Sequence, residues 1–251
     1  MNAPQLTILT GASRGLGLAL ARGRLKRGDT LLTLSRHVND GLQREAEAAG
    51  AVLEQWAIDL AQPDAAADRL AAWLALAPRP GRVDLVNNAA ALPTIAPLEG
   101  VPAEDLVRAM QVGLIAPMLL TRAFLAATAG WGVPRRVLNI SSGLGRRAMA
   151  SQAAYCAAKA GMDHFSRAVA LEQAALPGGA RVVSLAPGVI DTDMQVQLRE
   201  ADPDRFADRF RFVDMKRGGH LDSPEQAAAK VLAFLDREDF GREPVADVRD
   251  A

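Results

Sequence analysis

The chain has 251 residues, of which 49% are hydrophobic and 23% are charged, and its 29 basic side chains balance its 29 acidic ones. This composition is that of an ordinary globular protein, and it argues against intrinsic disorder, a collagen helix and a coiled coil. A net charge of zero gives no general attraction to nucleic acid or to an anionic membrane, so neither is expected as a partner.

Apolar segments of strand length alternate along the chain with longer segments of helical pattern. The strand candidates are nearly continuous apolar runs, which are typical of strands buried on both faces of a parallel sheet. They span residues 5–10, 30–35, 51–58, 83–87, 135–140 and 181–186. Helices are predicted at 15–27, 41–49, 64–76, 103–128 and 151–175, and a last one begins after the N-cap Ser223 and ends near Leu235.

This alternation predicts βαβ units and therefore an α/β fold, a doubly wound parallel sheet between two layers of helices. Right-handed crossovers give the strand order 3-2-1-4-5-6 of a Rossmann-type sheet. No linker rich in glycine, serine or proline divides the chain, so residues 1–251 are expected to form a single domain. Residues 194–222 follow the sixth strand, where such a sheet binds ligands, and are either a substrate-covering segment or a surface insertion.

Few residues of the chain suit metal or disulfide chemistry. Cys156 is the only cysteine, which excludes an internal disulfide and a site with several cysteine ligands. The three histidines lie far apart without the spacing of metal ligands, so no metal is expected. No basic and apolar leader opens the chain and no uncharged apolar run reaches about 18 residues, so we expect a cytoplasmic protein without signal peptide or membrane span.

A glycine-rich turn joins the first strand to the first helix. Residues 10–17 read Thr-Gly-Ala-Ser-Arg-Gly-Leu-Gly. The glycines permit a tight turn and bring backbone N–H groups close to a diphosphate, while the helix N-terminus adds its positive end. A glycine pattern alone is a weak signal, but the order of strand, turn and helix is the one that a dinucleotide site requires.

The residues after the second strand indicate which dinucleotide binds. An acidic residue there would hydrogen-bond the ribose hydroxyls of NAD, but this chain has Ser35 and Arg36. Arg36, together with Arg14 in the glycine turn, would pair with the 2′-phosphate of NADP. After the third strand, Asp59 and Leu60 are placed to meet the adenine, although Asp59 could equally cap the next helix.

Three side chains form a candidate catalytic group. Tyr155 and Lys159 are four residues apart in a predicted helix and so share one helix face. The lysine ammonium and an oxidised nicotinamide would favour tyrosinate and lower the pKa of the phenol. Ser142 follows the fifth strand, at the edge of the sheet where ligands bind, and its hydroxyl could hold a carbonyl oxygen.

Two further segments follow strands at the same edge of the sheet. Residues 87–90 read Asn-Asn-Ala-Ala, and small residues there let a nucleotide pack against the backbone. Residues 187–192 read Pro-Gly-Val-Ile-Asp-Thr, and Thr192 could hydrogen-bond the nicotinamide carboxamide.

Taken together, these motifs resemble the short-chain dehydrogenase/reductase family over essentially the whole chain. The resemblance implies a Rossmann fold, a nicotinamide cofactor and reversible hydride transfer to a carbonyl. It implies Ser142, Tyr155 and Lys159 as catalytic residues, and Tyr155 and Lys159 also contact the cofactor. The other implied cofactor-binding residues are Gly11, Ser13, Arg14, Gly15, Leu16, Gly17, Arg36, Asp59, Leu60, Asn87, Ala89, Val189 and Thr192.

Within the family, the C-terminal third looks most like sepiapterin reductases and their bacterial relatives, the benzil reductases. Residues 186–195 carry this likeness, and so does Asp247, which follows Asp239-Phe240 by seven residues in a short strand-like stretch. In sepiapterin reductases an aspartate at that position anchors the pterin. The resemblance therefore implies Ser142, Tyr155, Gly188 and Asp247 as substrate-binding residues, with a surface carboxylate as the alternative for Asp247.

The chain departs from the family pattern at two positions. Ala90 replaces a glycine, which adds one methyl group. Gly113 stands eight residues before Thr121, where the family has an active-site asparagine whose main-chain carbonyl holds a water linked to the lysine. Glycine keeps that carbonyl but loosens a helix interior, so the rigidity of the relay is in question.

The sequence is therefore interpreted as an NADPH-dependent carbonyl reductase, with a vicinal dicarbonyl, on a pterin side chain or in a diketone, as substrate. One alternative is a 3-oxoacyl thioester reductase or an alcohol dehydrogenase of the same fold, with Arg146 and Arg147 as a basic patch for pantetheine. A second is a non-catalytic NADPH-binding sensor. The family also implies a homodimer or homotetramer formed by the helices of 103–128 and 151–175.

Overall fold

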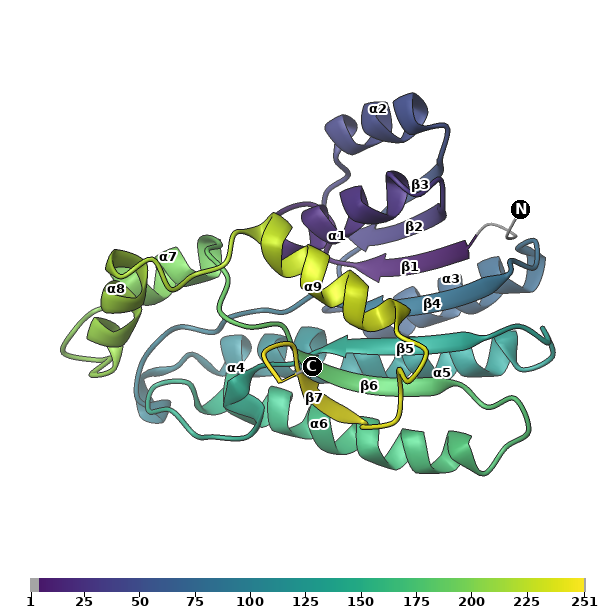
Figure 1. Cartoon of the computed structure of the whole chain (residues 1–251). Helices are drawn as coiled ribbons and strands as arrows, with labels where there is room; N and C mark the ends of the chain where they lie inside the picture. The colour runs from purple at the N-terminus through teal and green to yellow at the C-terminus, as the bar shows by residue number, and fades with distance from the viewer. Residues whose placement is uncertain (1–4, 251) are drawn as a thin grey trace.

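The computed structural model describes residues 5–250, which form one seven-stranded sheet between two layers of helices (Figure 1). The strands are ordered β3-β2-β1-β4-β5-β6-β7, and every neighbouring pair is parallel. The predicted doubly wound order of six strands is confirmed. A short seventh strand, β7 (Val245–Asp247), extends the sheet beside β6.

The elements agree with the expected ranges to within a few residues. The strands are β1 (Gln5–Thr10), β2 (Thr30–Ser35), β3 (Val52–Ala57), β4 (Arg82–Asn87), β5 (Arg135–Ile140) and β6 (Arg181–Ala186). The helices are α1 (Gly15–Leu25), α2 (Asp40–Ala49), α3 (Pro63–Leu76), α4 (Ala103–Met110), α5 (Ala116–Thr128), α6 (Ala153–Ala174), α7 (Asp193–Glu200), α8 (Arg209–Arg217) and α9 (Pro224–Asp236).

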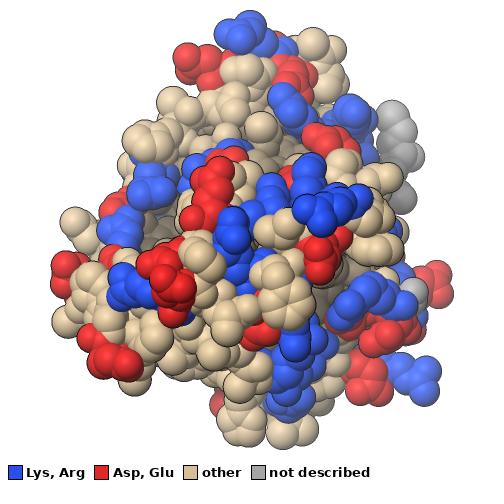
Figure 2. All heavy atoms as spheres, turned by 90° about the vertical axis from the view of Figure 1, so that its left-hand side faces the viewer, with Lys and Arg blue, Asp and Glu red and all other residues tan. Residues whose placement is uncertain are grey.

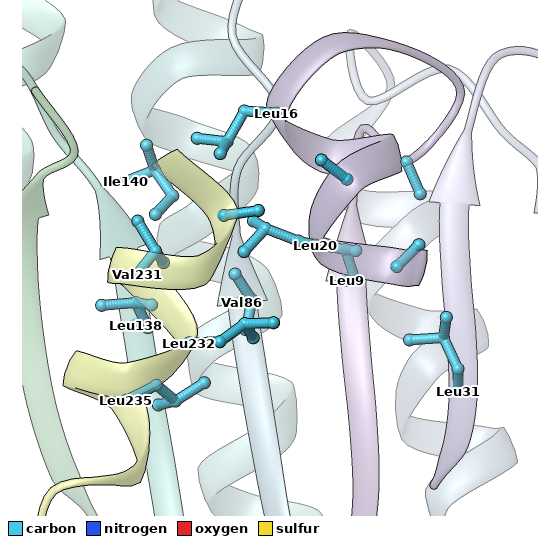
Figure 3. Close-up of a cluster of buried hydrophobic side chains, with 14 of the residues drawn as sticks. Leu9, Leu16, Leu20, Leu31, Val86, Leu138, Ile140, Val231, Leu232 and Leu235 are labelled. Carbon is cyan, nitrogen blue, oxygen red and sulfur yellow. The ribbon is translucent and has the colours of Figure 1, made fainter. Parts of the chain in front are cut away.

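Each face of the sheet carries its own hydrophobic core. On one face, α1 and α9 pack leucine and valine side chains onto the central strands, as Leu20 and Leu232 do over Val86 (Figure 3). On the other face, α3 and α5 pack together, with Leu70 and Phe124 fully buried. Because both faces are covered, inner strands such as β1 and β2 are buried apolar runs. The edge strand β3 departs from this expectation, since Trp56 is its only buried residue.

The predicted helix 103–128 is a single helical run with a π-helical turn at Gln111–Ile115 between α4 and α5. Pro117 has no N–H to donate to the carbonyl of Gly113, and its ring would crowd that carbonyl in a regular α-helix. The turn thus follows from the proline. By length and composition this 26-residue run could cross a membrane, but half of its most apolar window is buried in the fold.

Residues 194–222 contain α7 and α8, which pack against each other beside the end of the sheet toward which the strand arrows point (Figure 1). Leu198, Phe206 and Phe212 form a small apolar cluster of their own there. The segment is therefore folded over the carboxyl edge of the strands, the edge at which ligands of such sheets bind.

Candidate active site

A cavity of about 1030 Å³ opens at the carboxyl edge of the sheet. Residues at or directly after the ends of all six strands from β1 to β6 contribute to its walls, and α7 and α8 close one side of it. Figure 2 views the molecule from this side and shows acidic and basic side chains interspersed over the surface. The cavity lies at the position that the order of the strands predicts.

The glycine turn at the start of α1 is shaped to hold a diphosphate. Gly11 and Gly15 have positive φ angles of 73° and 54°, which favour glycine. A side chain on Gly17 would place its Cβ 2.0 Å from the carbonyl oxygen of Gly11, so no other residue fits. No side chain caps the N-terminus of α1, which leaves its first N–H groups for an anion. The turn lines the cavity, and its cradle therefore fits a dinucleotide.

Asn88, which the sequence analysis did not single out, holds this turn in place. Its side-chain amide donates to the carbonyl oxygens of Thr10 and Gly11, at 3.0 and 3.2 Å. Its own N–H and that of Ala89 donate to the hydroxyl of Thr10 at 2.9 and 3.0 Å. The end of β4 is thereby fastened to the phosphate turn, and Ala89 lines the cavity as predicted.

Asn87 was predicted to bind the cofactor, but it faces away from the cavity. It is fully buried and donates to the side-chain oxygens of Asn139 at 2.8 Å and Thr121 at 3.3 Å. Successive side chains at a strand end point to opposite faces, so only one of the two neighbouring asparagines can reach the phosphate turn. The sequence held no signal for choosing between them.

The part of the cavity wall beside the ends of β2 and β3 includes Arg36, Asp59 and Leu60, and Arg14 of the glycine turn also lines the cavity. Arg36 is exposed at the end of β2, and Arg14 forms an exposed ion pair with Asp193 at 2.9 Å. The Asp59 carboxylate accepts the N–H of Ala61, which lowers its pKa. The N-cap of α3 is Gln62, so Asp59 stabilises the turn before the helix and does not cap it.

Tyr155, Lys159 and Ser142 all line the cavity, as predicted. The Lys159 ammonium donates to the carbonyl oxygen of Ile140 at 2.7 Å and lies 5.7 Å from the centre of the Tyr155 ring. Burial lowers the pKa of Lys159 to about 8. The hydroxyl oxygen of Ser142 accepts the N–H of Leu144 at 3.2 Å, and the same hydroxyl hydrogen-bonds the Tyr155 phenol.

The pKa of Tyr155 differs from the expectation of a lowered value. Burial raises the pKa of Tyr155 to about 12, while the hydrogen bond with Ser142 opposes the rise. The desolvation of the phenolate thus outweighs the neighbouring groups in this structure. At neutral pH the phenol is therefore fully protonated, the state that a proton donor needs.

Asp163, one turn after Lys159 on α6, organises the floor of the site. One of its oxygens accepts the hydroxyls of Ser141 at 2.5 Å and Ser184 at 2.7 Å, and the other lies 3.4 Å from Arg146. Its charge partly offsets the effect of burial on the pKa of Lys159. The sequence shows that Asp163 is four residues after Lys159, but it does not reveal the contacts of Asp163 with the two serines and Arg146.

Gly113 lies in the π-helical turn and packs against α6. A Cβ on Gly113 would come 3.2 Å from the Cβ of Ala158, which is a tight contact. The small residue thus lets the π-helical turn and α6 approach closely at Ala158, the residue directly before Lys159. Because Pro117 cannot bond the Gly113 carbonyl, that carbonyl lacks its usual helical partner.

The segment after β6 reaches the cavity through Gly188, Val189 and Thr192, as predicted. Gly188 has a positive φ of 85°, which favours glycine at this position. Thr192 also lies against the phosphate turn, because a Cβ on Gly15 would be 3.4 Å from its methyl group.

The structure does not support Asp247 as a pterin anchor. Asp247 is only 5% exposed on β7 and borders a second, smaller hollow instead of the main cavity. Both of its oxygens accept the Arg249 guanidinium, at 2.8 and 2.6 Å, which lowers its pKa. The resemblance to sepiapterin reductases pointed to Asp247 as the carboxylate. It gave no indication that the Arg249 side chain would bind both oxygens of that carboxylate.

The wall opposite the catalytic group is apolar and rich in methionine. Met194 and Leu198 of α7 and Phe212 and Met215 of α8 contribute to it, with Met149 from the loop before α6. Methionine side chains adapt their shape to what they contact. This wall is suited to a bulky apolar or aromatic group.

Comparisons with known proteins agree with this geometry. The sequence model described as short chain dehydrogenase matches residues 5–203. Benzil reductase ((S)-benzoin forming) of Bacillus cereus is 34% identical over 235 residues, which cover 93% of this chain and 94% of that protein. Sepiapterin reductase of Bos taurus is 31% identical over 249 residues, which cover 94% of this chain and 91% of that protein.

Solved structures give the same picture. The KRED1-Pglu enzyme superposes with a TM-score of 0.79 at 26% identity, covering 94% of this chain and 98% of its own. A putative 2-deoxy-d-gluconate 3-dehydrogenase from Agrobacterium tumefaciens with bound NADP has a TM-score of 0.80 at 27% identity, covering 97% of this chain and 94% of its own.

Proposed function

The chain belongs to the short chain dehydrogenase family, and from this premise we propose that it is an NADPH-dependent reductase of compounds with two adjacent carbonyl groups. The observation that carries the proposal is the convergence of Ser142, Tyr155 and Lys159 in one cavity with the glycine cradle. A cradle alone would suit a sensor, but a serine, a phenol and a buried ammonium that line the same cavity suit proton transfer to a carbonyl.

NADP is the cofactor that the residues fit. The glycine turn and the uncapped start of α1 would hold its diphosphate, and Arg36 would pair with the 2′-phosphate. Arg14 can bind the same phosphate as Arg36 if it leaves its ion pair with Asp193. That pair is exposed, so breaking it costs little free energy. When bound, the cofactor supplies the hydride that the carbonyl carbon receives.

The protein's own groups would act on the carbonyl oxygen. When a substrate binds, the O–H of Ser142, which hydrogen-bonds Tyr155 in this structure, donates to that oxygen instead and polarises the carbonyl. Tyr155, held protonated by its raised pKa, gives the oxygen its proton. Lys159 uses one of its three N–H groups on Ile140, which leaves two for a ribose hydroxyl and for the path that returns a proton to Tyr155.

The substrate class follows from the walls of the cavity and from the relatives. The apolar wall of α7 and α8 favours a substrate with aromatic or alkyl groups, and we propose that residues 194–222 cover it. Benzil reductases and sepiapterin reductases are the supporting relatives. Of the two arginines that a 3-oxoacyl thioester would use, Arg146 is committed to Asp163, to Asp247 and to the carbonyl of Ala246, which leaves Arg147 in the cavity wall for a pantetheine.

The exposed apolar residues Val107, Ile115 and Met118 of the run 103–128 support association with a second copy through these helices. Size-exclusion chromatography with light scattering tests this part of the proposal, and a monomer at micromolar concentration would contradict it.

The test of the proposed function is NADPH consumption with a diketone, a pterin diketone and an acetoacetyl thioester, and NADPH formation from NADP with a simple alcohol. Rapid turnover of one of the first two and slow turnover of the others supports the proposal. A preference for the thioester or the alcohol would show that the proposed substrate class is wrong, but it would leave the proposed roles of Ser142, Tyr155 and Lys159 unchanged. Tight NADPH binding without any turnover would favour the sensor.

A further inference from the structure

Two glutamine side chains in the wall of the main cavity are buried without hydrogen-bond partners among residues 5–250. Gln152 is 1% exposed and Gln195 is 8% exposed, and both line the cavity. The side-chain nitrogen of Gln152 and the side-chain oxygen of Gln195 have no partner within the described part of the chain. Since buried polar groups are nearly always paired, these two atoms point to a ligand.

Gln152 is placed beside the catalytic tyrosine. It is the residue before α6, three positions before Tyr155, and its carbonyl oxygen accepts the N–H of Cys156 at 2.8 Å. This bond fixes its backbone to the first turn of the helix. Its side chain forms no cap on that helix, although the position would allow one. The amide is therefore held near Tyr155 and left unused by the fold.

An amide at this place suits an oxygen next to the reacting carbonyl. Its NH₂ group donates to a ketone oxygen, and this second oxygen remains a ketone when its neighbour is reduced, so the amide can bond both a dicarbonyl substrate and the hydroxyketone product. Gln195, held at the start of α7 by its N–H bond to Thr192 at 2.8 Å, presents an acceptor to the same cavity. A simple ketone would leave the Gln152 amide unpaired.

We infer that Gln152 binds the second oxygen of a vicinal dicarbonyl and makes the site select such compounds over simple ketones. The inference rests on the proposed function, since Ser142 and Tyr155 must hold the first oxygen. A site built to hydrogen-bond a group discriminates strongly against analogues that lack it, because its own polar atoms are then left unpaired.

The experiment compares benzil with deoxybenzoin, which has the same two rings and a CH₂ group in place of one carbonyl. The variant Gln152→Met keeps the length of the side chain and removes the amide. It is expected to lower kcat/KM for benzil by about tenfold or more, because a hydrogen bond in a dry site is lost. The kcat/KM for deoxybenzoin and the Kd of NADPH should stay unchanged.

Two controls accompany this variant. Gln43→Met makes the same change at an exposed site on α2, outside the cavity, and should alter neither substrate. Gln152→Glu keeps the size and replaces the NH₂ donor with a second acceptor, so it should impair benzil reduction at least as much. The melting temperature of each variant shows that the comparison is made on folded protein.

Any other kinetic result would show which part of the reasoning is wrong. Equal losses for benzil and deoxybenzoin, or a weaker Kd for NADPH, would assign Gln152 to the fold or the cofactor and overturn the inference. Unchanged kinetics with both ketones would show that water alone satisfies the amide, and would overturn it as well. If the wild type reduces simple ketones but no dicarbonyl, the proposed substrate class fails first and the inference falls with it.

Discussion

Raising the pH should weaken NADPH binding through the loss of one proton from Lys159. Burial lowers the pKa of this ammonium from 10.5 to about 8, because it is moved out of water. Below that pKa the group is charged and attracts the dinucleotide. Binding of an anionic ligand stabilises the charged form, so the pKa of Lys159 in the complex lies higher than in the free protein.

The sign and size of the effect follow from this difference. Affinity for NADPH should be constant below the pKa of the free protein, since Lys159 is then protonated in both states. Above it, binding must take up a proton, and affinity falls about tenfold, or about 1.4 kcal/mol, for each further pH unit. The decline ends at the higher pKa of the complex.

The assay is the Kd of NADPH, measured from its fluorescence without any carbonyl substrate between pH 6 and pH 10. Lys159→Met is the matched control, because it keeps a long side chain and cannot titrate. It should bind NADPH more weakly at neutral pH and show no decline above pH 8. Cys156→Ser changes the residue next to Tyr155 without touching Lys159 and should keep the decline. A wild-type Kd that stays flat to pH 10, or an equal decline in Lys159→Met, would refute the assignment.

Three further predictions concern single residues. Tyr155→Phe should lower kcat by about 100- to 10,000-fold, the range of general acid catalysis, while the Kd of NADPH stays unchanged; near-normal turnover would remove Tyr155 from the mechanism. Arg36→Ala should reduce the preference for NADPH over NADH in kcat/KM by about tenfold or more, because a charge-assisted bond contributes about 1.5–3 kcal/mol, and an unchanged ratio would contradict its role. Asp84→Asn should lower the free energy of unfolding by about 3–5 kcal/mol in denaturant titrations, since it leaves the buried Arg24, 3.1 Å away, without its closest counter-charge. Unfolding at the wild-type denaturant concentration would show that this buried pair contributes little.

The sheet and the position of the cavity could be predicted because they depend on patterns that the sequence displays directly. Continuous apolar strands alternate with helices, and only one strand order is common for that alternation. The glycine turn and the pair Tyr155 and Lys159 are local motifs, so their geometry follows from a few adjacent residues. Each of these residues lines the cavity in the structure.

The features that sequence could not give depend on contacts between distant segments. Asn88 binds the phosphate turn while its neighbour Asn87 faces the core, and the strand end alone does not say which faces where. Asp247 lies on β7 beside β6, but its pairing with Arg249 depends on how the last residues fold back. The side-chain nitrogen of Gln152 has no partner among residues 5–250, which depends on how all the segments around it fold.

The raised pKa of Tyr155 shows a different limit. Sequence analysis could name the charged groups near the phenol but not the extent of its burial, and burial is the larger effect here. The direction of the shift favours a protonated phenol. Oxidation should accelerate as the pH rises, because it requires tyrosinate.

The central claim, that this protein reduces dicarbonyl compounds with NADPH at Ser142, Tyr155 and Lys159, is tested most directly by one measurement. Wild type and Tyr155→Phe are incubated with NADPH and benzil, and the loss of NADPH is followed together with the amount of hydroxyketone formed. The wild type should consume one NADPH for each hydroxyketone, and the variant should bind NADPH with the same Kd yet consume almost none. No hydroxyketone from the wild type, or equal amounts from both proteins, would contradict the claim.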